Sequence, residues 1–362
     1  MSAPPVAIGP APADWIQTCR RCGRGWDLAS PGWRCQCGGL LDLQGPKADP
    51  IGGTEPWSLW RYRSVLPAGD SWKKVTLGEG LTPLVAVRPG LWCKLDYLMP
   101  TRSFKDRGAA VMMSVAAGLG VERVTADSSG NAGMAVSAYA ARAGMEATVF
   151  VPAATPAAKV QAIGAYGARV VAVEGDRAAV AVAAREATQA SGAWYASHVY
   201  RPAFVHGVKT LAFELWEQLG GRAPGTVVVP AGNGTLVLGL WLGFRELAFA
   251  GRVPQVPAIV AVQAERCAPL AGLRPGGPTV ATGIAIAEPP RIGEVRAAIL
   301  ASGGRVVTVP EDDLEPARGA LARMGIGVEP TGAVVWAAWG TGAGPASGYD
   351  AEPVVLVLTG AG

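Results

Sequence analysis

The sequence predicts an α/β protein with two open parallel-sheet α/β domains, a cleft between them, and a small N-terminal four-cysteine ribbon. Three observations lead to this prediction. Ala-rich helical stretches alternate with short β-branched runs from Gly108 onward, and the same alternation returns in the C-terminal half. Four of the six cysteines lie close together near the N-terminus. Alternating strands and helices are typical of parallel sheets, whereas clustered cysteines indicate a separate small element.

The composition favours a folded protein that binds neither nucleic acid nor membranes. The 362 residues include 32 basic and 28 acidic side chains, which gives a formal net charge of +4, and 50% of the residues are apolar. A charge this balanced does not suit a protein that wraps a polyanion, and the apolar fraction is sufficient for a large core. No segment reaches the ~18 consecutive apolar residues of a membrane span. We therefore expect a soluble, cytoplasmic protein.

The four N-terminal cysteines have the spacing of a small metal site. Cys19 and Cys22 form one pair, and Cys35 and Cys37 form a second pair after twelve intervening residues. Two tight turns that each present two thiolates commonly bind zinc tetrahedrally, and four thiolates leave no open position for catalysis. We expect a structural zinc ion. Four unrelated reduced cysteines remain the alternative, because the second pair is CxC and not the commoner CxxC.

Hydrophobic patterns place the expected helices and strands. Helices are expected at 109–119, 132–143, 157–166 and 177–190. Strands are expected at 122–126, 146–151 and 169–173, and in the C-terminal half at 226–229, 258–263, 305–309 and 354–358. This spacing predicts parallel strands joined by right-handed crossovers, and two such sheets would create a cleft.

Lys105 is the first candidate catalytic residue. It is one of seven lysines in the chain and lies in the motif PTRSFKDRG, directly before the first strong helical pattern. A lysine beside the amide groups of a helix N-terminus can bind a phosphate or form a Schiff base. Taken alone, a solvated lysine in a charged turn is the commoner explanation.

Three further motifs follow expected strands at their carboxyl ends, where open parallel sheets bind ligands. Residues 127–133 (DSSGNAG) offer hydroxyl and amide donors that suit a carboxylate or a phenolic oxygen, and residues 229–236 (VPAGNGTL) suit a monophosphate. Residues 354–362 (VVLVLTGAG) would deliver a threonine hydroxyl to a planar ligand. Each motif alone is explained by helix capping or a chain end. Together with the lysine they meet the requirements of pyridoxal 5'-phosphate.

These motifs resemble the fold type II pyridoxal-phosphate enzymes of the tryptophan synthase beta-like superfamily, and within them the threonine synthase-like branch. The matching segments are GEGLTPL at 78–84, SFKDRG at 103–108, SSGNAG at 128–133, AYAARAG at 138–144, VKTLAFEL at 208–215, AGNGT at 231–235, VEPTGA at 328–333 and LTGAG at 358–362. The cysteine segment, which ends in CGGLL, is similar to the small ribbon that precedes many of these enzymes. The resemblance implies an amino-acid substrate and a pyridoxal-phosphate-dependent lyase of amino-acid biosynthesis.

The resemblance also implies a role for each matching residue. Lys105 would bind the cofactor covalently and move protons at the substrate carbons. Asn131 would hydrogen-bond the ring oxygen of the cofactor, and Thr359 would contact its pyridine nitrogen. The cofactor phosphate would be held by Gly232, Asn233, Gly234 and Thr235, and the substrate carboxylate by Ser128, Ser129 and Gly130. A neutral threonine hydroxyl makes the ring a weaker electron sink than an aspartate would, which suits eliminations and replacements at the β and γ carbons.

Two departures from the family pattern concern a second anion site. A threonine synthase acting on O-phosphohomoserine must also bind the substrate phosphate. Arg107 is the main candidate for this contact, and Arg102 and Lys209 are further ones. Arg102 stands where the family usually has glycine, in TGSFKDRG, and segment 196–210 lacks the asparagines and the glutamate of the common pattern NSxNPxRxEGQKT. The substrate is therefore left open.

Three functions remain from this reasoning. The first is threonine synthase, and the second is a β-elimination or β-replacement enzyme on serine, threonine or phosphoserine, either a dehydratase or a cysteate-synthase-like enzyme. The third is a non-catalytic relative that binds the cofactor. We expect residues 1–45 to form a leader and the zinc ribbon, residues 46–107 and 206–362 a larger cofactor-binding domain, and residues 108–205 a smaller mobile domain. Enzymes of this kind often form homodimers, although nothing in the composition shows it.

Overall fold

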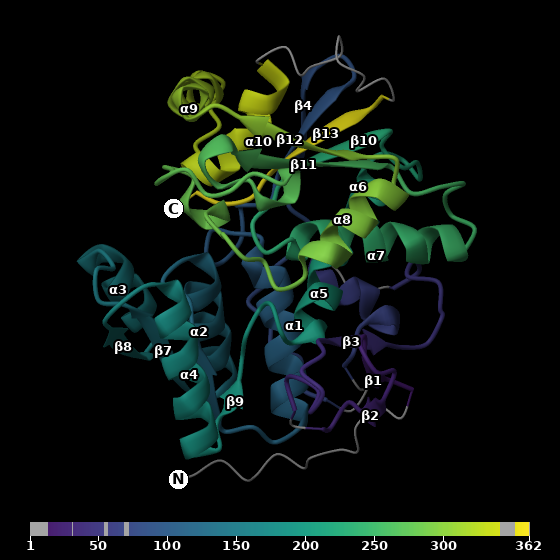
Figure 1. Cartoon of the computed structure of the whole chain (residues 1–362). Coiled ribbons are helices and arrows are strands. Elements are labelled where there is room, and N and C mark those ends of the chain that lie inside the picture. Colours follow the sequence, from purple (N-terminus) through teal and green to yellow (C-terminus); the bar gives the residue numbers. More distant parts are fainter. Residues whose placement is uncertain (1–13, 31, 54–56, 69–71, 341–351, 362) are drawn as a thin grey trace. The chain divides into compact units, whose positions relative to one another are not determined.

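The computed structural model describes residues 14–30, 32–53, 57–68, 72–340 and 352–361 (Figure 1). The chain forms two compact units. Unit 1 consists of Met1–Lys47, Val65–Leu77 and Gly108–Gly207, and unit 2 consists of Ala48–Ser64, Gly78–Arg107 and Val208–Gly362. Unit 1 includes the cysteine segment, which the sequence assigned to a region of its own. The predicted domain boundaries stay a prediction, because compact packing does not show which segments fold independently.

Unit 1 contains a small antiparallel sheet formed by the cysteine segment. β1 (Ile16–Cys19) lies between β2 (Gly25–Asp27) and β3 (Leu41–Gln44) and pairs with both. Trp15 and Leu43 of this segment pack in one buried cluster with Val115 and Ala203, which lie far away in the sequence. The cysteine segment is therefore part of the packed body of unit 1.

The second sheet of unit 1 is parallel, as the alternating pattern predicted. Its strand order is β8-β7-β6-β9. The strands are β6 (Arg123–Ala126), β7 (Glu146–Pro152), β8 (Arg169–Val173) and β9 (Trp194–Tyr195), and the helices are α2 (Asn131–Ala143), α3 (Ala157–Gly164) and α4 (Arg177–Ser191). Local signals fix the helix ends: Asp176 caps α4 by accepting from the amide of Ala179 at 3.0 Å, and Gly144 ends α2 in the left-handed conformation.

Unit 2 is built on a six-stranded sheet with the order β12-β11-β10-β13-β5-β4. Its strands are β4 (Leu84–Arg88), β5 (Leu91–Leu95), β10 (Thr226–Pro230), β11 (Ala258–Ala264), β12 (Arg305–Val309) and β13 (Val354–Leu358). All neighbouring pairs are parallel except the edge pair β4 and β5. Every residue of β10 and β13 is buried, which explains why these strands read as continuous apolar runs instead of alternating ones.

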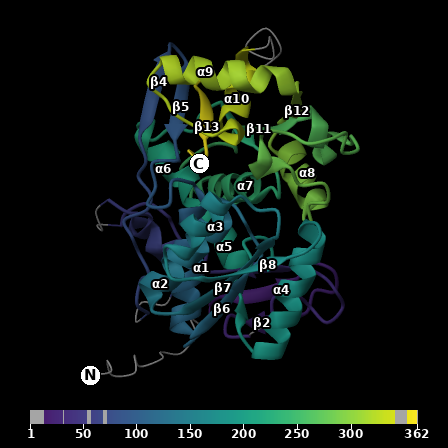
Figure 2. The ribbon, with the colours of Figure 1, turned by 90° about the vertical axis from the view of Figure 1, so that its left-hand side faces the viewer.

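Helices cover both faces of the unit 2 sheet. Figure 2 shows α9 (Leu314–Arg323) and α10 (Pro330–Gly340) on one side of it, and α7 (Thr235–Phe249) and α8 (Ile292–Ala301) on the other. α6 (Thr210–Gln218) packs beside α7. Short 3-10 turns complete this part of the chain: Leu59–Val65, Glu265–Cys267, Pro269–Ala271, Thr282–Ile284 and Glu311–Asp313.

Two helices pass from one unit into the other. They are α1 (Lys105–Gly118) and α5 (Pro202–Val208). None of the helices in the described ranges is long and apolar enough to cross a membrane.

Candidate active site and metal centre

Lys105 is the first residue of α1, and the loop before it is attached to the end of β13. The amide of Phe104 donates to the carbonyl of Thr359 at 3.0 Å, Ser103 forms a β-bridge with Gly360, and the amide of Ala361 donates to the carbonyl of Arg102 at 3.1 Å. These contacts hold the lysine segment at the carboxyl edge of the unit 2 sheet. The Lys105 ammonium nitrogen lies 3.7 Å from the centre of the Phe104 ring, so its charge faces an aromatic surface.

The glycine-rich loop after β10 has the form of an anion cradle. Gly234 adopts the left-handed conformation (φ +78°) and precedes the first turn of α7, where no side chain caps the amide groups. A Cβ atom at Gly234 would lie 2.1 Å from Cγ2 of Val295, and one at Gly232 would lie 3.0 Å from Cα of Ile284. A side chain at Gly234 would therefore displace Val295, and one at Gly232 would be tight against the backbone of Ile284. Free amides at a helix N-terminus, approached by a side-chain-free loop, suit a phosphate group.

The structure places Thr359 at the same sheet edge as this loop. β10 and β13 are adjacent and parallel, with Val228 opposite Leu356, so their carboxyl ends emerge side by side. Thr359 directly follows β13 and is buried, and residues 231–235 directly follow β10. Unit 2 therefore brings together Lys105, Gly232, Asn233, Gly234, Thr235 and Thr359. A lysine amine, a glycine-rich loop at a helix N-terminus and a threonine hydroxyl at one sheet edge are a set of groups that fits pyridoxal 5'-phosphate.

The remaining predicted contacts lie in unit 1, between β6 and α2. Gly130 is extended directly before α2, and Asn131 is the first residue of the helix. A Cβ atom at Gly133 would lie 2.0 Å from the carbonyl oxygen of Ser128, so the loop folds tightly over the helix start. Ser128, Ser129 and Asn131 are half-buried and Gly130 is exposed. These residues form one donor cluster, and their meeting with the unit 2 residues around a single cofactor stays a prediction.

Arg107 is fully buried in a network of charges inside unit 2. Its guanidinium donates to Asp96 through Nε at 3.0 Å and Nη2 at 2.6 Å, and to Glu214 through Nη1 at 2.5 Å and Nη2 at 2.7 Å. Nη1 also donates to the hydroxyl of Thr210 at 3.1 Å. All three guanidinium nitrogens are thus engaged with protein groups. This geometry favours a structural role over the substrate contact that the resemblance implied.

Lys94 completes the network. The sequence alone did not indicate that these charged residues would meet. Its ammonium donates to Glu214 at 2.8 Å and to the carbonyl of Thr82 at 2.6 Å. Burial opposes the charge of Glu214, but the Arg107 guanidinium and the Lys94 ammonium together lower the pKa of its carboxyl to about 2. Thr82 and Glu214 lie in the matching segments GEGLTPL and VKTLAFEL. Each of these two motifs has a polar residue between apolar ones. This was the one feature of the sequence that could have indicated a buried charge network.

Lys209 is also held by the protein. Its ammonium lies 2.8 Å from Oε1 of Glu246 on α7, and its side chain is buried. Burial lowers the pKa of Lys209, and burial raises the pKa of Glu246. Both pKa shifts disfavour the charged form of the group. The attraction between the two charges opposes these shifts and so limits them. The pair joins α7 to the start of α6.

The four N-terminal cysteines lie together as a candidate metal centre. Their sulfur atoms all fall within 4.8 Å of one another, with 3.5 Å between Cys19 and Cys37 and 3.6 Å between Cys22 and Cys35. Tetrahedral zinc with Zn–S bonds near 2.3 Å requires sulfur separations of about 3.8 Å. The amide of Arg21 donates to the Cys19 sulfur at 3.3 Å, and the amide of Cys37 donates to the Cys35 sulfur at 3.4 Å. The donor set and its spacing fit zinc.

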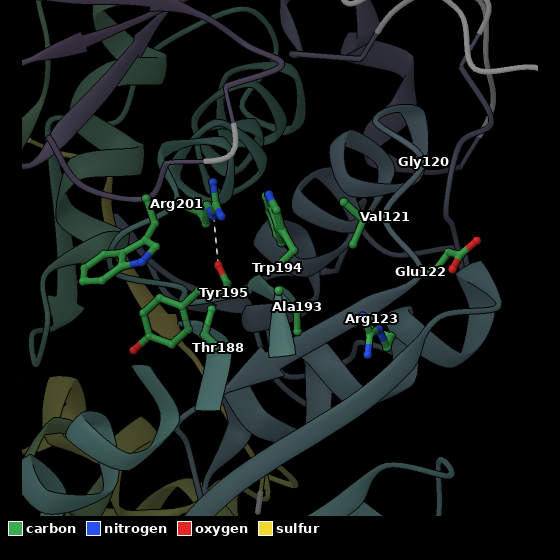
Figure 3. A pocket seen from close by; sticks show the side chains of 11 residues that line it. Gly120, Val121, Glu122, Arg123, Thr188, Ala193, Trp194, Tyr195 and Arg201 are labelled. Atoms are coloured by element: carbon green, nitrogen blue, oxygen red, sulfur yellow. Dashed lines mark hydrogen bonds between the residues drawn. The ribbon is translucent and has the colours of Figure 1, made fainter. Parts of the chain in front are cut away.

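A separate pocket of about 320 Å³ lies within unit 1 (Figure 3). Arg201 is buried there, with its guanidinium 3.8 Å from the centre of the Trp194 ring, and donates to the carbonyls of Tyr195 at 2.8 Å and Gly32 at 3.1 Å. Burial lowers the pKa of Arg201 to about 9. The residues that line the pocket include none of the predicted site residues. Arg201 joins the cysteine segment to the end of β9, which is a structural function.

Neither histidine is placed for catalysis by its observed contacts. Nε2 of His206 lies 2.9 Å from the carbonyl of Leu43, and its ring packs edge-on against Trp15. His198 packs edge-on against Phe204. Both rings are buried within unit 1.

Comparisons with known proteins show the family of this chain. Residues 75–360 match the family described as pyridoxal-phosphate dependent enzyme. The chain is 31% identical to a threonine synthase of Methanocaldococcus jannaschii, over 88% of this chain and 85% of the relative. It is 33% identical to a threonine synthase of Methanosarcina acetivorans, over 87% of this chain and 84% of the relative.

Solved structures give the same result at the level of the fold. The processed form of threonine deaminase isoform 2 from Solanum lycopersicum superposes with a TM-score of 0.66 and 25% identity, over 78% of this chain and 79% of that one. The match to the pyridoxal-phosphate dependent enzymes spans the lysine motif, the glycine-rich loop and the end of β13, which the structure gathers at one sheet edge. The chain belongs to the pyridoxal-phosphate dependent enzyme family and is a pyridoxal-phosphate-dependent lyase of the fold type II class.

Proposed function

We propose that this lyase is a threonine synthase, which converts O-phosphohomoserine and water to threonine and phosphate. The observation that carries the proposal is the similarity to threonine synthases over more than four-fifths of both chains. The attachment of the lysine loop to the end of β13 supports it, because it sets a proton-transferring amine beside the cofactor positions.

Each residue of the site has a defined task in this proposal. Bound pyridoxal phosphate supplies an electron sink for negative charge that develops on the substrate carbons. The Lys105 amine removes one proton from Cα and one from Cβ, and returns one proton to Cγ and one to Cα. Phosphate leaves Cγ, and water supplies the hydroxyl at Cβ and the proton that the departing phosphate takes up. The amides around Gly232 and Gly234 hold the cofactor phosphate in place. Thr359 contacts the ring nitrogen through a neutral hydroxyl, which limits how much charge the ring takes up.

The unit 1 residues bind the amino acid in this proposal. The hydroxyls of Ser128 and Ser129 and the first amides of α2 receive the substrate carboxylate, because a helix N-terminus stabilises an anion. Asn131 orients the cofactor ring through its side-chain amide. Fixing both the carboxylate and the ring sets the angle at which the Cα–H bond faces Lys105, and such positioning is a major part of catalysis.

A second candidate function is β-elimination or β-replacement on serine, threonine or phosphoserine. The observation that favours it is segment 196–210, which lacks the asparagines and the glutamate common in threonine synthases. The experiment that separates the two functions incubates one preparation with O-phosphohomoserine, serine, threonine and phosphoserine in parallel. Threonine and phosphate from O-phosphohomoserine support the proposal. Keto acid and ammonia from serine or threonine, with no threonine from O-phosphohomoserine, would replace it by the second function.

A further inference from the structure

We infer that Arg102 determines substrate specificity by binding the phosphate group of an amino acid that carries a phosphate on its side chain. The inference rests on the proposed function and names the residue that supplies its second anion site. Three cations were candidates for this contact: Arg102, Arg107 and Lys209. The structure distinguishes them by burial, by their partners and by their position relative to Lys105.

Arg107 and Lys209 are unsuited to the contact because the protein already occupies them. Arg107 has no exposed surface and donates to two carboxylates through all three of its nitrogens. Lys209 is 1% exposed and pairs with Glu246. Releasing Arg107 toward a substrate would leave the fully buried carboxylates of Asp96 and Glu214 without their counter-charge, which is strongly unfavourable. Releasing Lys209 would break its ion pair with the half-buried Glu246.

Arg102 has the opposite properties. Arg102 is exposed, and within the described residues its side chain forms no hydrogen bond or ion pair. Its backbone, in contrast, is fixed: its amide donates to the carbonyl of Met99 at 2.9 Å, and its carbonyl accepts from Ala361 at 3.1 Å. The guanidinium is therefore an available cation on a rigid base, three residues before Lys105, at the edge where the cofactor residues gather.

The backbone conformation of Arg102 indicates that its side chain has a functional role. Its φ is +64°, in the left-handed region that favours glycine. A glycine would adopt this conformation without strain, yet the chain has a large cationic residue here. Non-glycine residues in such conformations concentrate at functional sites. A guanidinium also matches a phosphate group well, because its planar N–H donors bind two oxygens at once.

The test measures binding, so that it does not depend on turnover. The ligands are 2-amino-5-phosphonopentanoate, in which CH₂ replaces the ester oxygen of O-phosphohomoserine, and norvaline, which has the same carbon chain without the phosphonate. The dissociation constant of each is measured by calorimetry for the holoenzyme, for Arg102→Gly and for Arg102→Lys. The matched control is Arg222→Gly, since Arg222 is an exposed arginine at the opposite, amino end of β10.

Arg102→Gly should weaken binding of the phosphonate by at least about 10-fold and leave norvaline binding within about twofold. The affinity of Arg102→Lys for the phosphonate should lie between those of the unmodified holoenzyme and Arg102→Gly, because lysine keeps the charge but lacks the planar pair of donors. Arg102→Gly should also raise the melting temperature by relieving the strain, so that lost affinity cannot be attributed to misfolding. Arg222→Gly should change neither affinity.

Two results would overturn the inference. One is phosphonate binding to Arg102→Gly that is as tight as in the unmodified holoenzyme. The other is an equal loss of phosphonate and norvaline binding, which would mean that Arg102 only shapes the site. Failure of the proposed function gives a different result: phosphonate binding still depends on Arg102, but O-phosphohomoserine yields no threonine. In that case Arg102 selects another phosphorylated amino acid.

Discussion

The amide of Phe104 donates to the carbonyl of Thr359 at 3.0 Å, across 255 positions of the sequence. This bond and the neighbouring bridge between Ser103 and Gly360 make the lysine loop an extension of β13. Lys105, the proposed nucleophile, is thereby fixed to the strand that ends at Thr359, the proposed partner of the cofactor ring. Catalytic groups on rigid elements keep their geometry better than groups on free loops.

Replacing Lys105 by alanine should remove the visible absorbance of lysine-bound cofactor and reduce turnover to background. Lys209 also directly precedes a helix, α6, but its buried ammonium pairs with Glu246. Spectra of the purified variant with added pyridoxal phosphate, together with product formation, provide the measurement. Lys159→Ala, at an exposed lysine of α3, is the control and should retain both properties. Retention of both in Lys105→Ala would show that another amine is the nucleophile.

Replacing Gly234 by alanine should weaken the affinity for pyridoxal phosphate by at least about fivefold, because overpacking of this kind costs roughly 1–3 kcal/mol. The new Cβ would lie 2.1 Å from Val295 and would displace the cradle. Gly220→Ala is a matched control: Gly220 also has a positive φ, +69°, but a Cβ there meets nothing within 4 Å. Titration of each apoenzyme variant with pyridoxal phosphate measures the two affinities. Equal effects of the two substitutions would mean that backbone strain alone is responsible.

The buried network should make the free energy of unfolding depend on pH in the acid range. The pKa of Glu214 is about 2 in the folded protein and near 4.5 when unfolded, so the unfolded state binds the proton first as the pH falls. The stabilisation is therefore complete above about pH 4.5 and is lost as the pH falls toward 2, by a few kcal/mol in all.

Denaturant unfolding between pH 2 and 7 measures this effect. Glu214→Gln should flatten the acid limb and lower the stability at neutral pH, because Arg107 and Lys94 lose a counter-charge. Glu217→Gln, which removes a half-buried carboxylate on the same helix, is the control and should keep the acid limb. An unchanged acid limb in Glu214→Gln would show that other carboxylates govern acid unfolding.

The cysteine cluster should bind about one zinc ion per chain. Double replacement of Cys19 and Cys22 by serine should abolish metal binding, because two thiolates cannot hold a closed tetrahedral site. Metal analysis of protein purified under reducing conditions is the measurement. Cys93→Ser and Cys267→Ser are the controls, since both cysteines lie outside the cluster. Full zinc content in the double variant would place the metal elsewhere.

Much of the fold could be predicted from the sequence because its strands are strongly patterned. The expected strands at 305–309 and 354–358 agree with β12 and β13 residue for residue, and the parallel arrangement of both sheets is confirmed. The antiparallel direction of the edge pair β4 and β5 could not be predicted, because strand direction is not encoded in a β-branched run. The pairing of the cysteine segment with unit 1 depends on Trp15 and Leu43, whose partners lie far away in the sequence.

The candidate site could be predicted only as a set of separate motifs. Local signals placed Lys105 before a helix and Gly234 in a turn, and the structure has both there. The fate of Arg107 could not be predicted, since its partners Asp96 and Glu214 come from β5's end and from α6. Tertiary packing decides whether a cation is exposed to solvent or paired with buried carboxylates. For the same reason the sequence could not separate Arg102 from the other two cations.

The most direct test of the proposed function is the stoichiometry of phosphate and threonine released from O-phosphohomoserine by the holoenzyme, with Lys105→Ala as the control. The account predicts equal amounts of the two products at every time point and neither product from the variant. Phosphate release without threonine, or no phosphate at all while serine or threonine gives keto acid and ammonia, would contradict it.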